Sequence, residues 1–304
     1  MKIISLIICT YNRDDLLEPC LSSLVNQNAD RELFEVIVVN NNSTDNTQKI
    51  AEDFAKEQPN FRVVTEMTQG LSHARNRGYK EAEGDYVAYI DDDAKAPPDW
   101  VERILKAFEK VTPSPVAVGG KYHPWYEEPP PPWFTDDIEV RTWGEKEGFL
   151  QPPRAQYGFS GSNMAFQKSL LQSYGGFSPG FGMDGGKMGL GEETELFYRI
   201  YKDYPLFWYD PKIIVLHLVP ARNMTVSYCL RRTFYGGGVV TRIEGSASLY
   251  VIIKAILLLT LNICIFPLRV KWWQKNWRRS FIKQSQPIAG AIGFLMTIYK
   301  RSGD

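Results

Sequence analysis

Residues 86–93 read Tyr-Val-Ala-Tyr-Ile-Asp-Asp-Asp, an apolar run that ends abruptly in three carboxylates. The apolar part has the β-branched and aromatic composition of a strand, and the prolines at 97 and 98 prevent it from continuing. Three adjacent carboxylates repel one another unless a cation or a hydrogen-bond network holds them. Mg²⁺ and Mn²⁺ prefer such oxygen ligands, together with water and phosphate. This stretch therefore predicts a strand whose carboxyl end holds a metal and a phosphate group.

The segments around this strand alternate between strand and helix. Strands are predicted at 3–9, 34–39, 61–65 and 85–90, and helices from Asp14, up to Phe54, over 73–81 and over 99–110. Short connections between such elements predict an α/β fold with a mixed, mainly parallel sheet flanked by helices. Ligands of these sheets bind at the carboxyl ends of the strands. The polar turns 10–14 and 40–47 fall at those ends, beside the acidic triplet.

The second half of the chain is less regular. Strands are predicted at 116–122, 161–166, 206–209 and 212–218, and helices at 167–174 and from Glu192 onward. The proline-rich stretch 123–134 is either a rigid linker or an aromatic wall of an acceptor pocket. Residues 175–191 contain eight glycines, which predicts a disordered loop or a mobile lid.

Three titratable residues in this half allow two interpretations each. His217 lies near the end of a predicted strand and is either structural or a ligand of a metal or phosphate. Glu192 and Glu193 lie in the first turn of a predicted helix, where the helix dipole alone favours acids. The same dipole is expected to lower a carboxylate pKa and so keep a general base ionised at neutral pH.

The charges are unevenly distributed although the net charge is zero. Residues 245–303 contain no Asp or Glu, whereas nine Lys and Arg residues lie there. We therefore expect two regions with different surroundings, a domain over 1–240 and a C-terminal region over 241–304. The four cysteines show no metal-binding spacing and are expected to be free thiols. The N-terminal apolar run is too short for a signal peptide and fits the first strand better.

The C-terminal region combines apolar segments with a tryptophan-rich basic segment. Residues 250–268 are almost entirely apolar, but their uninterrupted part is shorter than the roughly 20 residues of a membrane-spanning helix. The following segment, 269–283, interleaves three tryptophans with six basic residues, as is typical of contact with an anionic lipid surface. We predict that 250–299 associates with the cytoplasmic face of the membrane, peripherally or by shallow insertion. A tilted span and a soluble helical subdomain are the alternatives, and nucleic acid is a poorer fit.

Six segments, in order and at fitting intervals, resemble the family 2 inverting glycosyltransferases, and the C-terminal tail resembles the membrane-associated members that build bacterial surface polysaccharides. The six segments are SLIICTYNR, VIVVNNNSTDNT, GLSHARNRG, YIDDDAKAPPDW, GSNMAF with GGFSPGFG, and GEETELFYRI, which lie between residues 3 and 240. The resemblance implies a GT-A fold, a divalent metal (Mn²⁺ or Mg²⁺) and a nucleotide-diphosphate-sugar donor, with a UDP-sugar favoured. It also implies a glycan or lipid-linked acceptor in cell-surface polysaccharide synthesis.

For the donor, the resemblance implies roles for five residues. Thr10, Asn12 and Arg13 would line the base and ribose pocket. Asn40 stands where the family usually has an Asp that meets the base, and an amide oxygen there can still accept from a base N–H. Arg75 would lie near the base and the phosphates.

For the reaction, the resemblance implies a metal site and a general base. Asp93 would bind the metal directly, Asp91 would contact the ribose or orient a water on the metal, and His217 would be a further metal or phosphate contact. Glu193 would take the proton from the acceptor hydroxyl, with Glu192 as the alternative.

Other classes of protein fit the sequence less well. A nucleotidyltransferase would need a glycine- and lysine-rich phosphate-binding start, which residues 10–15 do not supply. A nucleotide-sugar-binding scaffold without transfer would lack the acidic triplet or the base, and both are present. A processive synthase would carry a QxxRW segment, which residues 274–279 do not match.

Overall fold

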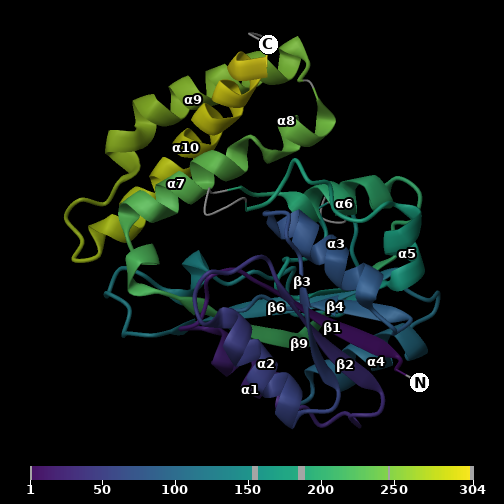
Figure 1. The fold of residues 1–304 in the computed structure, drawn as a ribbon. Coiled ribbons are helices and arrows are strands. Elements are labelled where there is room, and N and C mark those ends of the chain that lie inside the picture. The colour runs from purple at the N-terminus through teal and green to yellow at the C-terminus, as the bar shows by residue number, and fades with distance from the viewer. Residues whose placement is uncertain (1, 153–156, 184–188, 246, 302–304) are drawn as a thin grey trace. The chain divides into compact units, whose positions relative to one another are not determined.

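The computed structural model describes residues 2–152, 157–183, 189–245 and 247–301 (Figure 1). The chain forms two compact units. The first contains Met1–Trp125 and Glu139–Leu218, and the second contains Tyr126–Ile138 and Val219–Asp304.

A parallel four-stranded sheet forms the first half of unit one. Its strands are β1 (Ile4–Thr10), β2 (Phe34–Asn40), β3 (Phe61–Thr65) and β4 (Tyr86–Tyr89), in the order β3-β2-β1-β4. In this register Thr10 lies beside Asn40, so the ends of β1 and β2 coincide. The polar turns after these strands are therefore brought to one edge of the sheet, as the sequence predicts.

Helices cover both faces of this sheet because its strands are apolar on both faces. The helices are α1 (Leu17–Val25), α2 (Thr47–Glu57), α3 (Leu71–Glu81) and α4 (Trp100–Lys110). Ile4, Leu6 and Ile8 of β1 belong to the core cluster that includes buried residues of α1 and α4. Ile7 points the other way, into the cluster that includes Ala74 of α3 and Leu196 of α6 (Glu192–Tyr201). The edge of the sheet that carries the polar turns is thus held between two packed layers.

The strands that follow β4 in the chain extend the sheet with antiparallel pairs. They are β8 (Met164–Gln167), β6 (Ala117–Tyr126), β9 (Phe207–Val219), β5 (Ala94–Lys95) and β7 (Gly148–Phe149), and the short helix α5 (Lys168–Ser173) follows β8. The predicted mixed α/β sheet is confirmed, and its parallel part is the first four strands.

Two of the predicted boundaries in this half are wrong. The expected strands 206–209 and 212–218 form the single strand β9. Pro211, which lacks an N–H, lies within this strand, and the next N–H, that of Lys212, donates to Asp210 Oδ1 at 2.8 Å. In addition, β6 continues to Tyr126, into the stretch expected to be a loop.

The described part of the glycine-rich segment is hydrogen-bonded to α3. The side-chain amide of Asn76 donates to the Phe177 carbonyl at 2.7 Å and accepts from the Phe177 N–H at 2.8 Å. The Ser72 hydroxyl donates to the Phe181 carbonyl, and the Leu71 N–H donates to the Met183 carbonyl, both at 2.9 Å. Residues 184–188, at the centre of the predicted lid, lie outside the described residues.

Unit two is helical and has its own small core. Its helices are α7 (Val226–Gly237), α8 (Val239–Glu244), α9 (Leu249–Arg269) and α10 (Trp277–Arg301). Trp133 and Phe134 are buried in a cluster with Met224 and Ile282. These two aromatic residues therefore pack in a core, and the prediction that they form a wall of an acceptor pocket is wrong for them.

Helix α10 packs against both α7 and α9 (Figure 1). Its backbone approaches that of α7 very closely: a Cβ atom at Gly293 would lie only 1.8 Å from the Phe234 carbonyl oxygen. Helix α9 has no buried residue. Within the described residues, α9 is also the helix that is long and apolar enough to cross a membrane, judged by length and composition.

Candidate active site

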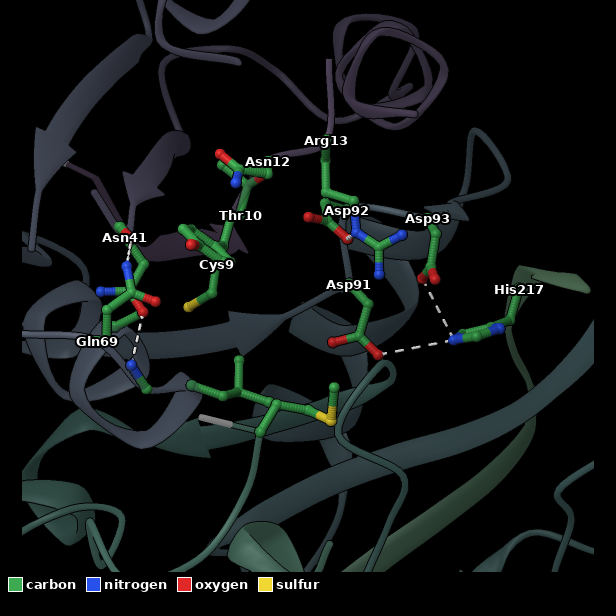
Figure 2. A pocket seen from close by; sticks show the side chains of 15 residues that line it. Cys9, Thr10, Asn12, Arg13, Asn41, Gln69, Asp91, Asp92, Asp93 and His217 are labelled. Atoms are coloured by element: carbon green, nitrogen blue, oxygen red, sulfur yellow. Dashed lines mark hydrogen bonds and ion pairs between the residues drawn. The ribbon is translucent and has the colours of Figure 1, made fainter. Parts of the chain in front are cut away.

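A cavity of about 410 Å³ opens at the carboxyl ends of the parallel strands (Figure 2). It is lined by residues that follow β1, β2 and β4, by the start of α3, and by single residues from distant parts of the chain. They are Cys9, Thr10, Tyr11, Asn12, Arg13, Asn41, Gln69, Gly70, Leu71, Ala74, Asp91, Asp92, Asp93, Met183 and His217. The cavity lies where an α/β sheet of this kind is expected to bind its ligand.

Three side chains at one end of the cavity form a candidate metal site. His217 Nε2 lies 3.3 Å from Asp93 Oδ1 and 3.8 Å from Asp91 Oδ2 (Figure 2). One ligand atom from each residue lies within 4.8 Å of the others. Asp93 Oδ1 is buried and makes no hydrogen bond, so it remains available to a cation. Two carboxylates and an imidazole suit a divalent ion such as Mn²⁺, so this set can hold the expected metal.

The local fold explains why His217 reaches the acidic triplet. After β4 the chain turns with the Ala94 N–H donating to the Asp91 carbonyl, and β5 then pairs with β9 so that Ala94 lies opposite His217. The imidazole stacks on the Tyr122 ring at 5.2 Å between centroids. This pairing places His217 beside Asp93, and the geometry therefore favours the ligand interpretation over a purely structural one.

The pKa values at the triplet fit a site that needs positive charge. Burial, with the charge of Asp91 added, raises the pKa of Asp93, and His217 opposes the rise. Burial and the charge of Asp93 raise the pKa of Asp92 to about 7, against the effect of Arg13. Asp92 is itself paired with Arg13, whose Nε lies 3.8 Å from Asp92 Oδ1. Asp92, to which the sequence assigned no role, thus holds Arg13 at the cavity wall.

The turns after β1 and β2 hold each other in place. The Asn12 side-chain oxygen accepts from the Thr44 N–H at 2.8 Å, and the Asn12 N–H donates to Ser43 Oγ at 3.0 Å. Asn12 adopts a left-handed backbone (φ 52°), which an asparagine tolerates better than most residues. As a result, Thr10, Asn12 and Arg13 all line the cavity, in the region where the sequence predicts the base and ribose pocket.

Asn40 does not line the cavity, whereas its neighbour Asn41 does. The Asn40 side chain donates to Gln48 Oε1 at 2.5 Å and accepts from the Ser43 N–H at 3.0 Å, so it stabilises its own turn. Asn41 Nδ2 donates to two carbonyls of residues 66 and 68, and its Oδ1 accepts from the Gly70 N–H at 2.9 Å. Asn41, one residue further along the chain, thus faces the cavity where Asn40 was expected.

Arg75, expected near the base and the phosphates, is 2% exposed and is not among the residues that line the cavity. Its guanidinium donates from Nη1 to Glu192 Oε1 at 2.7 Å and from Nη2 to Asp91 Oδ1 at 3.4 Å. Arg75 thus connects the acidic triplet to the start of α6.

The two glutamates at the start of α6 differ in their surroundings. Glu192 is buried and pairs with Arg75, while Glu193 is only partly buried. Burial and the neighbouring Glu192 raise the pKa of Glu193 to about 8, and Arg75 opposes the rise. The expectation that the helix start would lower this pKa is therefore wrong, because the loss of hydration outweighs the helix dipole.

Several cavity residues were not predicted from the sequence. Asn41, Gln69 and Met183 line the cavity, yet none carries a charge that would single it out. Asn41 could have been found from the strand register, since it is the first residue beyond the paired ends of β1 and β2. Met183 could not, because it lies in a glycine-rich segment with no periodic pattern.

Comparison with known proteins gives a consistent family match. The family model described as "Glycosyl transferase family 2" matches residues 5–175. A curated relative from Haloferax volcanii, "Glucosyl-dolichyl phosphate glucuronosyltransferase", is 27% identical over 201 residues, which cover 66% of this chain and 63% of the relative. The chain thus spans less than two thirds of that relative's length, and 29% and 30% of the next two.

Solved structures give the same fold. A mannosyltransferase from Pyrobaculum calidifontis, solved in complex with GDP-Man and Mn²⁺, has a TM-score of 0.65 at 19% identity and covers 96% of this chain and 86% of its own. TarS residues 1–349 from S. aureus, solved with UDP-GlcNAc, has a TM-score of 0.57 at 18% identity and covers 100% of this chain and 93% of its own. These likenesses confirm the predicted GT-A architecture.

Proposed function

Since the chain belongs to glycosyl transferase family 2, we propose that it moves a sugar from a nucleotide-diphosphate sugar to a hydroxyl of a glycan or lipid-linked acceptor. The observation that carries this proposal is the convergence of Asp91, Asp93 and His217 at one end of the cavity. Such a set suits a metal–diphosphate, and the adjoining cavity offers the polar side chains of Asn12, Arg13 and Asn41 to a nucleoside. The Haloferax volcanii relative is named as acting on a dolichyl phosphate, which supports a lipid-linked acceptor.

The residues divide the chemistry between them. Asp93, Asp91 and His217 would hold a divalent metal, which neutralises charge on the departing diphosphate. Thr10, Asn12 and Arg13 would surround the base and ribose. Glu193 would accept the proton of the attacking hydroxyl, from the face of the sugar opposite the leaving group, and so invert the anomeric configuration. Glu192 is a poorer base because its carboxylate is committed to Arg75.

We assign the contact with the base to Asn41 instead of Asn40. Both N–H groups of its amide are used, and its Oδ1 accepts one hydrogen bond, from Gly70. An amide oxygen has two lone pairs, so one acceptor position remains. That position suits a ring N–H of the base, and a uracil base is our first choice.

The proposal is tested by thermal unfolding with nucleoside diphosphates. A ligand at 100 times its Kd stabilises a protein by about 2.7 kcal/mol, which raises Tm by several degrees. We expect UDP with Mn²⁺ to raise Tm and ADP with Mn²⁺ to have little effect. Chelation of the metal should reduce the shift. No response to UDP, GDP, CDP or ADP would contradict the proposal.

The membrane is proposed as a second contact, through α9. Large apolar side chains are exposed along it, including Leu257 (64%), Leu261 (54%) and Leu268 (82%). The two uncharged polar residues of α9 bond back to their own helix: Thr260 Oγ1 donates to the Ile256 carbonyl and Asn262 Nδ2 to the Leu258 carbonyl. These bonds satisfy part of the polar groups of both side chains within the helix, which lowers the cost of placing it in an apolar medium.

The segment after α9 supports a lipid surface as the partner. Trp272, Trp273 and Trp277 are exposed, with Lys271 just before them and Lys275 between the second and the third. Tryptophan favours the headgroup region, and Lys and Arg are attracted to anionic lipid. We propose that unit two associates peripherally or by shallow insertion with the cytoplasmic face of the membrane, with α9 as the inserted helix.

A further inference from the structure

The side chain of Arg75 is enclosed by residues from several segments of unit one. Its guanidinium carbon lies 5.4 Å from the centroid of the Phe177 ring and 5.9 Å from that of Tyr89. A Cβ atom at Gly161 would lie 2.4 Å from Arg75 Nη2, so the guanidinium in this position packs directly against the glycine. With 2% of its surface exposed and no share in the cavity wall, Arg75 is not placed to touch a donor.

The guanidinium instead connects two carboxylates that belong to different parts of the site. Nη1 donates to Glu192 Oε1 at 2.7 Å, and Nη2 donates to Asp91 Oδ1 at 3.4 Å. The second oxygen of Asp91 faces His217 Nε2 at 3.8 Å. Arg75 therefore orients Asp91 so that one oxygen points toward the candidate metal site.

At the other end, Arg75 holds the first residue of α6. The N-cap of this helix is Gly191, and no side chain caps the helix start. Gly191 has a positive φ of 99°, and as a glycine it does not by itself restrict the backbone at this point. The first turn is instead held from outside, by the pair between Glu192 and Arg75 and by the Ser178 hydroxyl, which donates to Glu195 Oε2 at 2.8 Å. The pair with Arg75 acts on the first residue of the helix, and Glu193 is the next residue.

We propose that Arg75 is a positioning residue, which sets the distance between the metal-site carboxylate of Asp91 and the base Glu193 without contacting the donor. The inference rests on the proposed roles of Asp91 and Glu193. It replaces the donor contact expected of Arg75 from the family resemblance. A planar guanidinium can bind two separate acids at once, whereas an ammonium group is a single point charge.

Arg75→Lys tests the proposal because it keeps the charge and removes the two-sided geometry. Partners that orient metal ligands typically change affinity or activity by about 10–100-fold when they are replaced. At saturating Mn²⁺ we expect the kcat for UDP release from a UDP-sugar to fall about 10–100-fold, with KM for the donor within about threefold. Calorimetric titration without donor should show Mn²⁺ binding weakened by about tenfold or more.

The matched control is Arg77→Lys on the same helix. Arg77 is more exposed and pairs with Glu81 at 2.8 Å, one turn away. This variant should leave kcat, KM and Mn²⁺ affinity unchanged. Glu192→Gln probes the same interaction from the other side, and it should lower kcat less than Glu193→Gln does.

A double variant tests the coupling independently of catalysis. Arg75→Met leaves Glu192 and Asp91 without their buried partner and should lower Tm strongly. Adding Glu192→Gln removes one unpaired buried charge, so Tm should recover in part. If Tm does not recover in the double variant, the proposed coupling is overturned. This readout does not require UDP binding, so it stays valid even if the proposed function fails.

Two other outcomes would also overturn the inference. If Arg75→Lys raises the donor KM while kcat is kept, Arg75 is a donor contact. If Arg75→Lys matches Arg77→Lys in kcat and in Mn²⁺ affinity, Arg75 does not position the site. Should Arg75→Lys fail to fold, Glu192→Gln decides, because an unchanged kcat in that variant contradicts the proposal.

Discussion

Two effects act in opposite directions on the carboxylate of Glu193. The start of α6 favours its ionised form, whereas burial and the adjacent Glu192 favour its neutral form. Burial prevails, and the pKa rises to about 8. A raised pKa gives the ionised carboxylate a stronger affinity for a proton, which suits a general base that acts near neutral pH.

Glu193→Gln should remove the base and leave the donor site intact. Transfer should fall by about 10²–10⁴-fold, the usual scale for loss of a general base. UDP should still raise Tm in the presence of Mn²⁺, because Glu193 is not among the residues that line the cavity. Steady-state rates and Tm shifts measured on one preparation check both parts. A variant that retains near-normal turnover would refute this assignment.

The raised pKa of Glu193 also predicts the pH dependence of the rate. The base acts when it is ionised, and kcat/KM reports the free enzyme. Below a pH of about 8, kcat/KM should therefore fall about tenfold per pH unit as Glu193 gains its proton. A profile of kcat/KM from pH 6 to pH 9 at saturating Mn²⁺, roughly spanning this pKa, checks the prediction. A flat profile across this range would be inconsistent with Glu193 as the base.

The raised pKa of Glu193 also predicts how the stability of the folded state depends on pH. The folded state holds a proton on Glu193 up to pH about 8, while an unfolded glutamate loses it near 4.3. The native state thus binds more protons between these values, and stability is lost as pH rises through them. Glu193→Gln cannot ionise, so its Tm relative to wild type should increase from pH 5 to pH 8, roughly the interval between the two pKa values. A constant difference would contradict the raised pKa.

Asp93→Asn should weaken metal binding through loss of its buried carboxylate. Its Oδ1 is buried without a hydrogen bond, and the amide would bring no charge to a divalent ion. Mn²⁺ affinity measured by calorimetry should fall at least about tenfold. Asp85→Asn is the matched control, because Asp85 is exposed before β4 and away from the cavity. Equal Mn²⁺ affinities in the two variants would argue against the metal site.

At the scale of elements, the sequence predicts most of unit one. Each parallel strand is a short apolar run followed by polar turn residues, and this local pattern is what packing on both faces requires. The errors have local causes as well. Pro211 suggests a break, but β9 continues through it from Phe207 to Val219. Trp133 and Phe134 resemble an exposed aromatic wall, but they pack into the core of unit two.

Helix α9 makes the membrane proposal testable with two substitutions. Leu257 and Leu261 are exposed, so Leu257→Lys with Leu261→Lys should leave Tm nearly unchanged. Binding to vesicles that contain anionic phospholipid should fall at least about tenfold, because charge is costly in hydrocarbon. Co-sedimentation measures the binding, and Tyr204→Lys, at an exposed position of unit one, is the control. Undiminished sedimentation of the double variant, or none for wild type, would exclude α9 as the contact.

At the scale of the whole molecule, the site joins residues that no local pattern connects. Asp91 and Asp93 are evident in the sequence as a charged strand end, and Glu193 as an acidic helix start. The contact between Arg75 and Glu192 spans 117 residues, and nothing in the composition of either segment announces it. That Asn41 rather than Asn40 faces the cavity depends on strand register, which only the assembled sheet defines.

The measurement that tests the central claim most directly is release of nucleoside diphosphate from a panel of UDP- and GDP-sugars. It is run with Mn²⁺, with a chelator, and with Glu193→Gln in place of wild type. We expect wild type to release one nucleoside diphosphate in the presence of Mn²⁺, and both the chelator and Glu193→Gln to abolish most of that release. Release that is independent of metal and of Glu193 would contradict the account. So would a protein that binds none of the donors and releases no nucleoside diphosphate from any of them.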